Sequence, residues 1–111
     1  MSTAKISRRS MLGAAIIAFM ESVKQAEASQ TYVIDIKNMQ FGAVPPELHV
    51  GDTVMWHNSD LFRHTATAKD GSFDLDLPPG GESKFMLTKP GALEVFCRFH
   101  PMMKAELTVS P

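Results

Sequence analysis

From Thr31 onward, apolar and polar residues alternate in short runs that are separated by glycine, proline and aspartate turns. Alternation with a period of two is typical of β-strands that bury one face, and no run after residue 28 has the period of a helix. Runs this short and this numerous predict a small antiparallel β-sandwich or barrel. The expected strands are Thr31–Lys37, Glu47–Val50, Thr53–Asn58, Arg63–Lys69, Lys84–Thr88, Ala92–Cys97 and Lys104–Val109.

The first 28 residues have a different character and predict an export signal. Basic residues between positions 5 and 9 precede an apolar stretch, residues 11–20, which is too short to span a bilayer but suits the core of a signal peptide. Ala26-Glu27-Ala28 has the small-x-small form of a cleavage site. We therefore expect residues 1–28 to be a cleavable signal peptide, residues 29–111 to be the mature domain, and its location to be the periplasm.

The route of export is less sharply indicated. Residues 7–12 (SRRSML) resemble a twin-arginine signal, although Met11 and Gly13 replace the usual phenylalanine and lysine. We expect a twin-arginine-like signal and leave general secretion open. An amphipathic helix that stays attached is the alternative to a signal peptide.

Length and charge narrow the classes of function. The 111 residues suffice for one small domain, and the net charge of −1 argues against a nucleic-acid surface, which would be strongly basic. Residues 29–111 hold seven basic and ten acidic side chains, a net charge of −3. A single cysteine excludes an internal disulfide, and an exported free thiol is a liability unless a ligand occupies it.

Residues 97–103 (CRFHPMM) form a C-x-x-H-x-x-M motif that contains this only cysteine. Cys97 ends one alternating run in phase with its apolar face, and Met103 begins the next run in the same way, so both side chains are expected to point inward. His100 lies in the loop between them. A thiolate, an imidazole and a thioether in one short loop suit copper, and a cysteine, two histidines and a distant methionine are the ligands of an electron-transfer copper site.

A second histidine must come from elsewhere in the chain. His64 shares its face with Ala66 and Ala68, which are small and apolar, so its ring is expected to point inward. His49 and His57 fall on the outward phase of their runs and are expected to be solvated surface imidazoles. We therefore expect one copper ion, held by His64, Cys97, His100 and Met103.

Each of these residues has an ordinary explanation when it is taken singly. A lone cysteine is usually a small buried hydrophobe, a histidine on an apolar face is usually a hydrogen-bonded core residue, and methionine fills gaps in cores. These explanations do not require cysteine, histidine and methionine to recur at intervals of three between two strands, and the metal site accounts for that spacing.

A wider pattern extends over nearly all of residues 31–109. It comprises residues 50–58 (VGDTVMWHN), His64-Thr65, residues 85–91 (FMLTKPG) and the 97–103 loop. The pattern resembles the cupredoxins, the blue-copper electron carriers, and most closely the plastocyanin/amicyanin group. The short loop, with Pro101 directly after the histidine, resembles amicyanin, because plastocyanin and pseudoazurin carry more residues before the methionine.

The resemblance implies an all-β Greek-key sandwich of about eight strands with copper at one end. It implies equatorial ligands at His64, Cys97 and His100 and an axial ligand at Met103. Two residues depart from the family pattern. Thr65 replaces the asparagine that ties two loops together near the thiolate, and Phe99 replaces the proline that amicyanin carries before its second histidine. The resemblance therefore implies that the hydrogen bond beside the thiolate is changed or absent, and that the reduction potential and the pH behaviour of His100 differ from the family pattern.

The expected function is that of a small soluble electron carrier, a monomer that shuttles one electron through a mononuclear type 1 copper site. Resemblance to amicyanin suggests a dehydrogenase donor and a c-type cytochrome acceptor. Electrons would pass through the edge of His100, within an apolar docking patch formed by Phe62, Phe99, Pro101 and Met102. The alternative is a protein that binds and delivers copper. An enzyme is not expected, because no catalytic motif is visible and too few histidines remain for a second metal centre.

Overall fold

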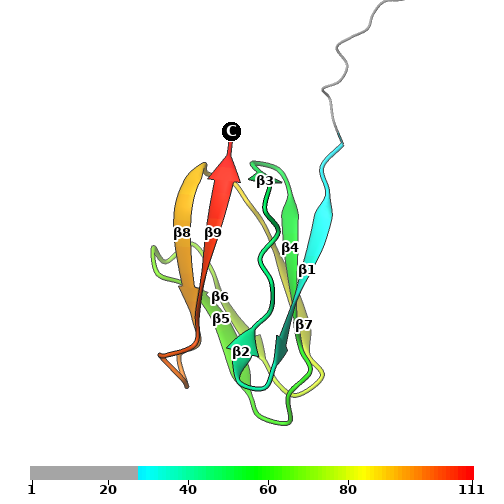
Figure 1. Cartoon of the computed structure of the whole chain (residues 1–111), viewed down its shortest axis with the longest axis vertical. Coiled ribbons are helices and arrows are strands. Elements are labelled where there is room, and N and C mark those ends of the chain that lie inside the picture. Colours follow the sequence, from blue (N-terminus) through cyan, green and yellow to red (C-terminus); the bar gives the residue numbers. More distant parts are fainter. Residues whose placement is uncertain (1–27) are drawn as a thin grey trace, which may run out of the picture.

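Nine β-strands form two sheets in the computed structural model of the chain, which describes residues 28–111 (Figure 1). The predicted signal peptide, residues 1–28, lies outside the described residues except for Ala28. None of residues 28–111 is helical, and this part of the chain therefore holds no apolar helix of the length that a bilayer crossing needs. The predicted all-β sandwich is confirmed.

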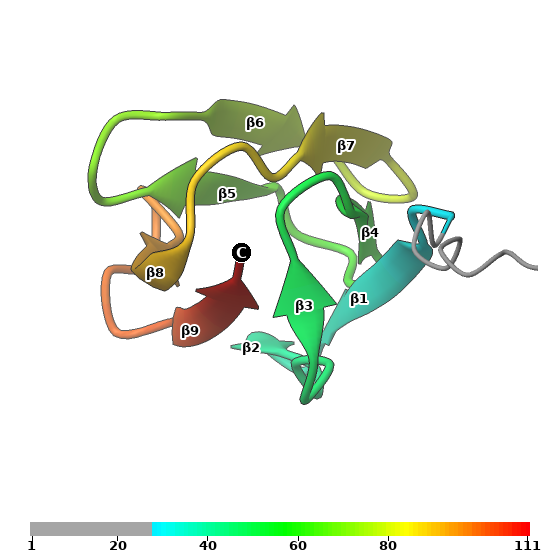
Figure 2. The ribbon, with the colours of Figure 1, turned by 90° about the horizontal axis from the view of Figure 1, so that it is seen from above.

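The strands divide four to five between the sheets. The first sheet has the order β2-β1-β4-β7 and the second has the order β3-β9-β8-β5-β6. Seen from above, the two sheets enclose a common interior, with the edge strands β6 and β7 in contact on one side and β2 and β9 in contact on the other (Figure 2). The bounds are β1 Thr31–Lys37, β2 Gln40–Phe41, β3 Leu48–His49, β4 Thr53–Asn58, β5 His64–Ala68, β6 Asp74–Leu77, β7 Glu82–Met86, β8 Gly91–Phe96 and β9 Lys104–Ser110.

Most neighbouring strands pair antiparallel, as predicted, but two pairs are parallel, which the alternation did not predict. β1 pairs with β4 in parallel, with Ile34 opposite Trp56, and β3 pairs with β9 in parallel. The reason is the route of the chain, which leaves the first sheet after β2, forms β3 in the second sheet, and returns for β4 in the direction of β1. Alternation within a run reports which face is buried but carries no information about the partner strand.

Most strands lie where the alternation predicts them, and β1 and β4 match to the residue. Two strands are missing from the prediction. β2 has only two residues, and β6 (Asp-Leu-Asp-Leu) contains two aspartates, which are depleted in strands because they compete with the ladder for backbone hydrogen bonds. β7 begins at Glu82, two residues before its predicted start.

The core lies between the sheets and is formed by the residues in the inward phase. Ile34, Ile36 and Trp56 from the first sheet face Val95 and Leu107 from the second, and all five are buried. Val50 ends the expected strand Glu47–Val50, but it is 40% exposed, whereas Leu48 is fully buried. The reason is that β3 ends at His49, so Val50 already belongs to the turn at Gly51, whose φ of 100° breaks the strand.

Three loops meet at one end of the sandwich, opposite the C-terminus (Figure 1). They are the turn between β1 and β2, the segment between β4 and β5, and the segment between β8 and β9. The segment between β4 and β5 is held by the buried side chain of Asn58. This side chain donates to the carbonyl oxygens of Phe62 at 2.7 Å and Leu77 at 2.8 Å, and it accepts from the Asp60 amide at 2.8 Å. Asn58 therefore fixes the loop that leads into His64.

Candidate metal centre

The loop between β8 and β9 consists of two consecutive β-turns. The Cys97 carbonyl accepts from the His100 amide at 3.2 Å, and the His100 carbonyl accepts from the Met103 amide at 2.8 Å. Pro101 occupies the second position of the second turn, where its fixed φ is favourable. A β-turn brings its first and fourth residues close together, so a repeat of three places the cysteine, the histidine and the methionine at the corners of one compact loop.

Three donor side chains converge at this end of the sandwich. The ligating atoms of His64, Cys97 and His100 all lie within 4.8 Å of one another, and no other three His, Cys, Asp or Glu side chains of residues 28–111 do so. Cys97 Sγ is 3.7 Å from Nδ1 of His64 and 3.7 Å from Nδ1 of His100. His64 and Cys97 are fully buried, whereas His100 is partly exposed.

These distances fit a bound metal. Ligand bonds of about 2.3 Å to sulfur and about 2.0 Å to imidazole nitrogen, at angles near 120°, separate the two donors by roughly 3.7 Å. One soft sulfur and two imidazole nitrogens in a buried setting suit copper better than the hard cations, which prefer oxygen. The donor set therefore fits one copper ion.

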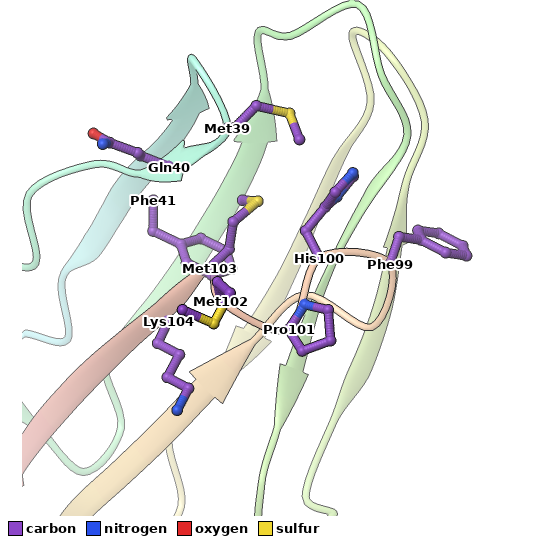
Figure 3. A pocket seen from close by; sticks show the side chains of 9 residues that line it. All are labelled: Met39, Gln40, Phe41, Phe99, His100, Pro101, Met102, Met103 and Lys104. Carbon is purple, nitrogen blue, oxygen red and sulfur yellow. The ribbon is translucent and has the colours of Figure 1, made fainter.

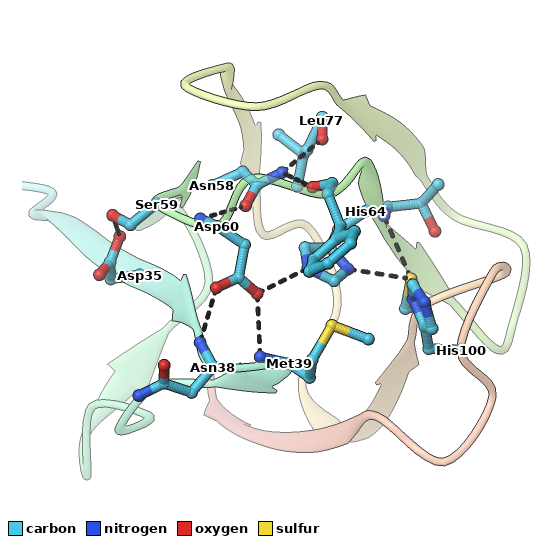
Figure 4. Close-up of polar contacts among 12 residues, drawn as sticks. Asp35, Asn38, Met39, Asn58, Ser59, Asp60, His64, Leu77 and His100 are labelled. Carbon is cyan, nitrogen blue, oxygen red and sulfur yellow. Dashed lines mark hydrogen bonds and ion pairs between the residues drawn. The ribbon is translucent and has the colours of Figure 1, made fainter.

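His64 is oriented by Asp60. Its Nε2 lies 2.8 Å from Oδ2 of Asp60, and because a carboxylate only accepts, Nε2 carries the proton and Nδ1 presents its lone pair towards Cys97 (Figure 4). A carboxylate that accepts the second N–H of a ligand histidine fixes the tautomer and the ring orientation.

The same carboxylate holds the turn between β1 and β2. Oδ1 of Asp60 accepts from the Asn38 amide at 2.7 Å, and Oδ2 accepts from the Met39 amide at 2.9 Å (Figure 4). Asn38 and Met39 have φ values of 55° and 61°, which residues other than glycine rarely adopt. Desolvation raises the pKa of Asp60, but the hydrogen bonds from Met39 and His64 outweigh it and leave this pKa below its ordinary value.

Cys97 receives a hydrogen bond at its sulfur. The Thr65 amide donates to Cys97 Sγ over 3.4 Å, and the Thr65 hydroxyl accepts from the Arg98 amide over 2.9 Å. The chain segment after the first histidine is therefore tied to the segment after the cysteine. The hydrogen bond between the two loops, expected to be changed or absent with Thr65 in place of asparagine, is present and is made by the Thr65 hydroxyl.

Two methionines face the centre. Met103 directly precedes β9 and lies beside His100, and it is buried, as its phase predicts (Figure 3). Met39 extends its thioether from the β1–β2 turn towards His64 and His100 (Figures 3 and 4). Sequence reasoning did not find Met39 or Asp60. A carboxylate four residues before a candidate ligand histidine is the one sequence signal that could have identified Asp60, whereas Met39 reaches the site only through the fold.

His49 and His57 lie outside the centre, as predicted. His49 is exposed, close to the buried carboxylate of Asp52. His57 is only half-exposed, and its Nδ1 lies 2.9 Å from the Asp35 carboxylate on the outer face of the first sheet. The prediction of solvated imidazoles thus holds for His49, whereas His57 is engaged in an ion pair or hydrogen bond.

A hollow of about 720 Å³ opens next to His100 (Figure 3). Three of the four residues expected in an apolar docking patch line it, namely Phe99, Pro101 and Met102, and Met102 is 91% exposed. Phe62, the fourth, is also exposed but does not line this hollow. The exposed edge of the donor cluster is thus surrounded by apolar side chains.

Comparison with known proteins agrees with this geometry. A family model of the cupredoxin-like domain matches residues 10–109. A reduced proline-to-phenylalanine mutant of amicyanin is 30% identical over 72% of this chain and 82% of its own, with a TM-score of 0.60. The Cu(I) form of a methionine-to-alanine mutant of amicyanin is 31% identical over 77% of this chain and 88% of its own, with a TM-score of 0.59.

A purple cupredoxin from Nitrosopumilus maritimus shares the fold, with a TM-score of 0.62 and 24% identity over 71% of this chain and 99% of its own. No curated protein matches the chain. The family match spans nine-tenths of the sequence, and the similar structures contain the same sandwich. The chain belongs to the cupredoxin family.

Proposed function

We propose that this protein is a monomeric periplasmic carrier of single electrons in which His64, Cys97, His100 and Met103 would hold one copper ion. The observation that supports this proposal most directly is the buried sulfur with two imidazole nitrogens at 3.7 Å. When bound, copper supplies a one-electron couple, Cu(II)/Cu(I).

The surrounding residues hold the donors in one arrangement. Asp60 fixes the ring of His64, Thr65 bridges the two loops, and the double turn fixes His100 relative to Cys97. A carrier benefits from such rigidity, since donors that do not move between oxidation states add little to the barrier for electron transfer. Burial of His64 and Cys97 also keeps water away from the metal.

The exposed side of the centre supports contact with partner proteins. His100 is the one donor that reaches the surface, and Phe99, Pro101 and Met102 form an apolar rim around it. Short-lived redox complexes use small interfaces, and a rim of this size suffices. The net charge of −3 on residues 29–111 favours partners with a basic surface. By resemblance to amicyanin, we propose a dehydrogenase donor and a c-type cytochrome acceptor.

A protein that delivers copper is the second candidate. Met39 and the exposed Met102 place two thioethers at the mouth of the centre, and thioethers are good ligands for Cu(I). The buried donors and the Asp60 hydrogen bonds favour retention over release, so we prefer the carrier. Catalysis is not proposed, because His49 and His57, the remaining histidines, lie outside the centre.

The experiment is a visible spectrum and a voltammogram of residues 29–111 after loading with copper. The carrier gives an intense absorption from sulfur-to-copper charge transfer and a reversible one-electron wave. Cys97→Ser loses both, whereas His49→Ala, the matched control outside the centre, keeps both. A colourless protein that passes Cu(I) to an acceptor would support delivery, and an absorption that survives in Cys97→Ser would refute the proposed ligand set.

A further inference from the structure

A chain of side-chain hydrogen bonds connects the surface of β6 to the backbone beside Cys97. Asp74 Oδ1 accepts from the Thr67 hydroxyl over 2.7 Å, and the Thr67 and Thr65 hydroxyls are 2.9 Å apart. The Thr65 hydroxyl accepts from the Arg98 amide over 2.9 Å, and the Arg98 Nε–H returns to Asp74 Oδ1 over 2.9 Å. The four residues close a ring.

The direction of every bond in this ring follows from Asp74. A carboxylate only accepts, so the Thr67 hydroxyl donates to Asp74 and has its lone pairs free for Thr65. The Thr65 hydroxyl therefore donates to Thr67 and accepts from the Arg98 amide. The Thr67 hydroxyl and then Arg98 hold the pKa of Asp74 below its ordinary value, which agrees with an ionised acceptor at neutral pH.

Thr65 occupies the position where this ring meets the metal centre. Its amide donates to Cys97 Sγ, and its hydroxyl binds the amide of Arg98, the residue after the cysteine. A threonine hydroxyl can take more than one rotamer in a strand, and the bond to Thr67 selects the one that reaches Arg98. The side chains of Thr65 and Thr67 are both buried.

We propose that Thr67 and Asp74 are positioning residues that help to set the reduction potential of the centre, because they fix Thr65 against the sulfur of Cys97. This inference rests on the proposed function. Hydrogen bonds to the cysteine sulfur tune the potential of a copper centre. A donor stabilises the more electron-rich, reduced state, so a loosened Thr65 amide lowers the potential.

The charge of Asp74 by itself predicts the opposite sign. Removal of a negative charge near a redox centre favours the reduced state and raises the potential. Asp76 is the matched control, since it lies on the same strand, opposite Thr65 in the ladder, and pairs with Arg63 at 3.1 Å. The side chains of Asp74 and Asp76 are 54% and 53% exposed, but Asp76 has no bond to the ring.

The test compares Thr67→Val, Thr67→Ser, Asp74→Ala and Asp76→Ala with the wild type. In the metal-free protein, amide hydrogen exchange followed by NMR should be faster at Arg98 and Thr65 in Thr67→Val and Asp74→Ala. In the copper-loaded protein, the ratio of reduced to oxidised form at a fixed buffer potential should fall by about threefold to tenfold in the same two variants, tenfold corresponding to 59 mV. Thr67→Ser, which keeps the hydroxyl, should match the wild type in both measurements.

Asp76→Ala should leave amide exchange unchanged and move the potential upward or not at all. An unchanged potential and unchanged amide exchange in Thr67→Val, or an upward shift in Asp74→Ala equal to that in Asp76→Ala, would overturn the positioning role. The absence of a charge-transfer band in the wild type would refute the proposed function and with it the effect on potential. A normal charge-transfer band in the wild type, together with an unchanged potential and unchanged amide exchange in Thr67→Val, refutes only the positioning role.

Discussion

Replacement of Asp60 by alanine removes the one carboxylate that joins two of the three loops at the metal end. Asp60 accepts hydrogen bonds from the amides of Asn38 and Met39 and from Nε2 of His64, at 2.7, 2.9 and 2.8 Å. We expect the metal-free form of this variant to be less stable than the metal-free wild type. We also expect the variant to bind copper more weakly. The two losses have the same cause, which is that the strained turn and the ligand ring share one acceptor.

The structure sets the size of the effect. A hydrogen bond to a charged group contributes about 1.5–3 kcal/mol. Water can replace the carboxylate at the exposed Asn38 amide, but not at the part-buried Met39 amide or at the fully buried His64 ring. Two such bonds give a loss of about 3–6 kcal/mol, compared with a total stability of about 4–12 kcal/mol for a domain of this length. Asp60→Asn keeps an acceptor but not the charge, and should lose about half as much.

The assay is urea unfolding of the metal-free protein, followed by the fluorescence of Trp56, which is the only tryptophan and is fully buried. Asp76→Ala is the control, since it breaks an ion pair whose side chains are both half-exposed and should cost about 0–1 kcal/mol. Copper affinity should fall by about 10-fold to 100-fold in Asp60→Ala. A loss of stability no larger than that of the control would refute the reasoning that Asp60 holds the loops.

Two further predictions concern the first sheet. Gly42→Ala should destabilise the protein by about 1–3 kcal/mol in thermal unfolding. The reason is that the added carbon would lie 2.9 Å from the backbone oxygen of Asp35, to which the Gly42 amide donates. An unchanged stability would mean that the backbone shifts to make room for the added carbon. Hydrogen bonds from the Ser59 hydroxyl, and then from His57, hold the pKa of Asp35 below its ordinary value of 3.8. The stability that this carboxylate contributes is therefore present above pH 3.8 and is lost as the pH falls through the lowered pKa. Unfolding free energies measured from about pH 5 to about pH 2 should therefore fall less steeply in Asp35→Ala than in the wild type, and parallel curves would contradict this.

Much of the strand pattern and the core of the site could be read from local sequence. The bounds of β1 and β4 follow from alternation, because the face that a strand residue presents depends only on its position in the run. The spacing of Cys97, His100 and Met103 predicts their proximity for a similar reason, since two successive turns bring every third residue together. His64 follows from its phase.

The positions that alternation mispredicted depend on neighbours elsewhere in the chain. β6 forms because its aspartates stand opposite the threonines of β5 and find partners in Thr67, Arg98 and Arg63, none of which the run itself reveals. The parallel pairing of β1 with β4 depends on where the chain crosses between sheets.

The sequence alone therefore determined the class of fold and the chemistry of the donors, because strand phase, turn spacing and ligand softness are properties of neighbouring residues. Only the tertiary structure decided which carboxylate orients His64, which methionine approaches from the β1–β2 turn, and how Asp74 is linked to the cysteine loop. These contacts join residues that are 4 to 33 positions apart. Their formation depends on how two sheets are stacked, and that stacking brings together groups whose positions along the chain do not predict their distance in space.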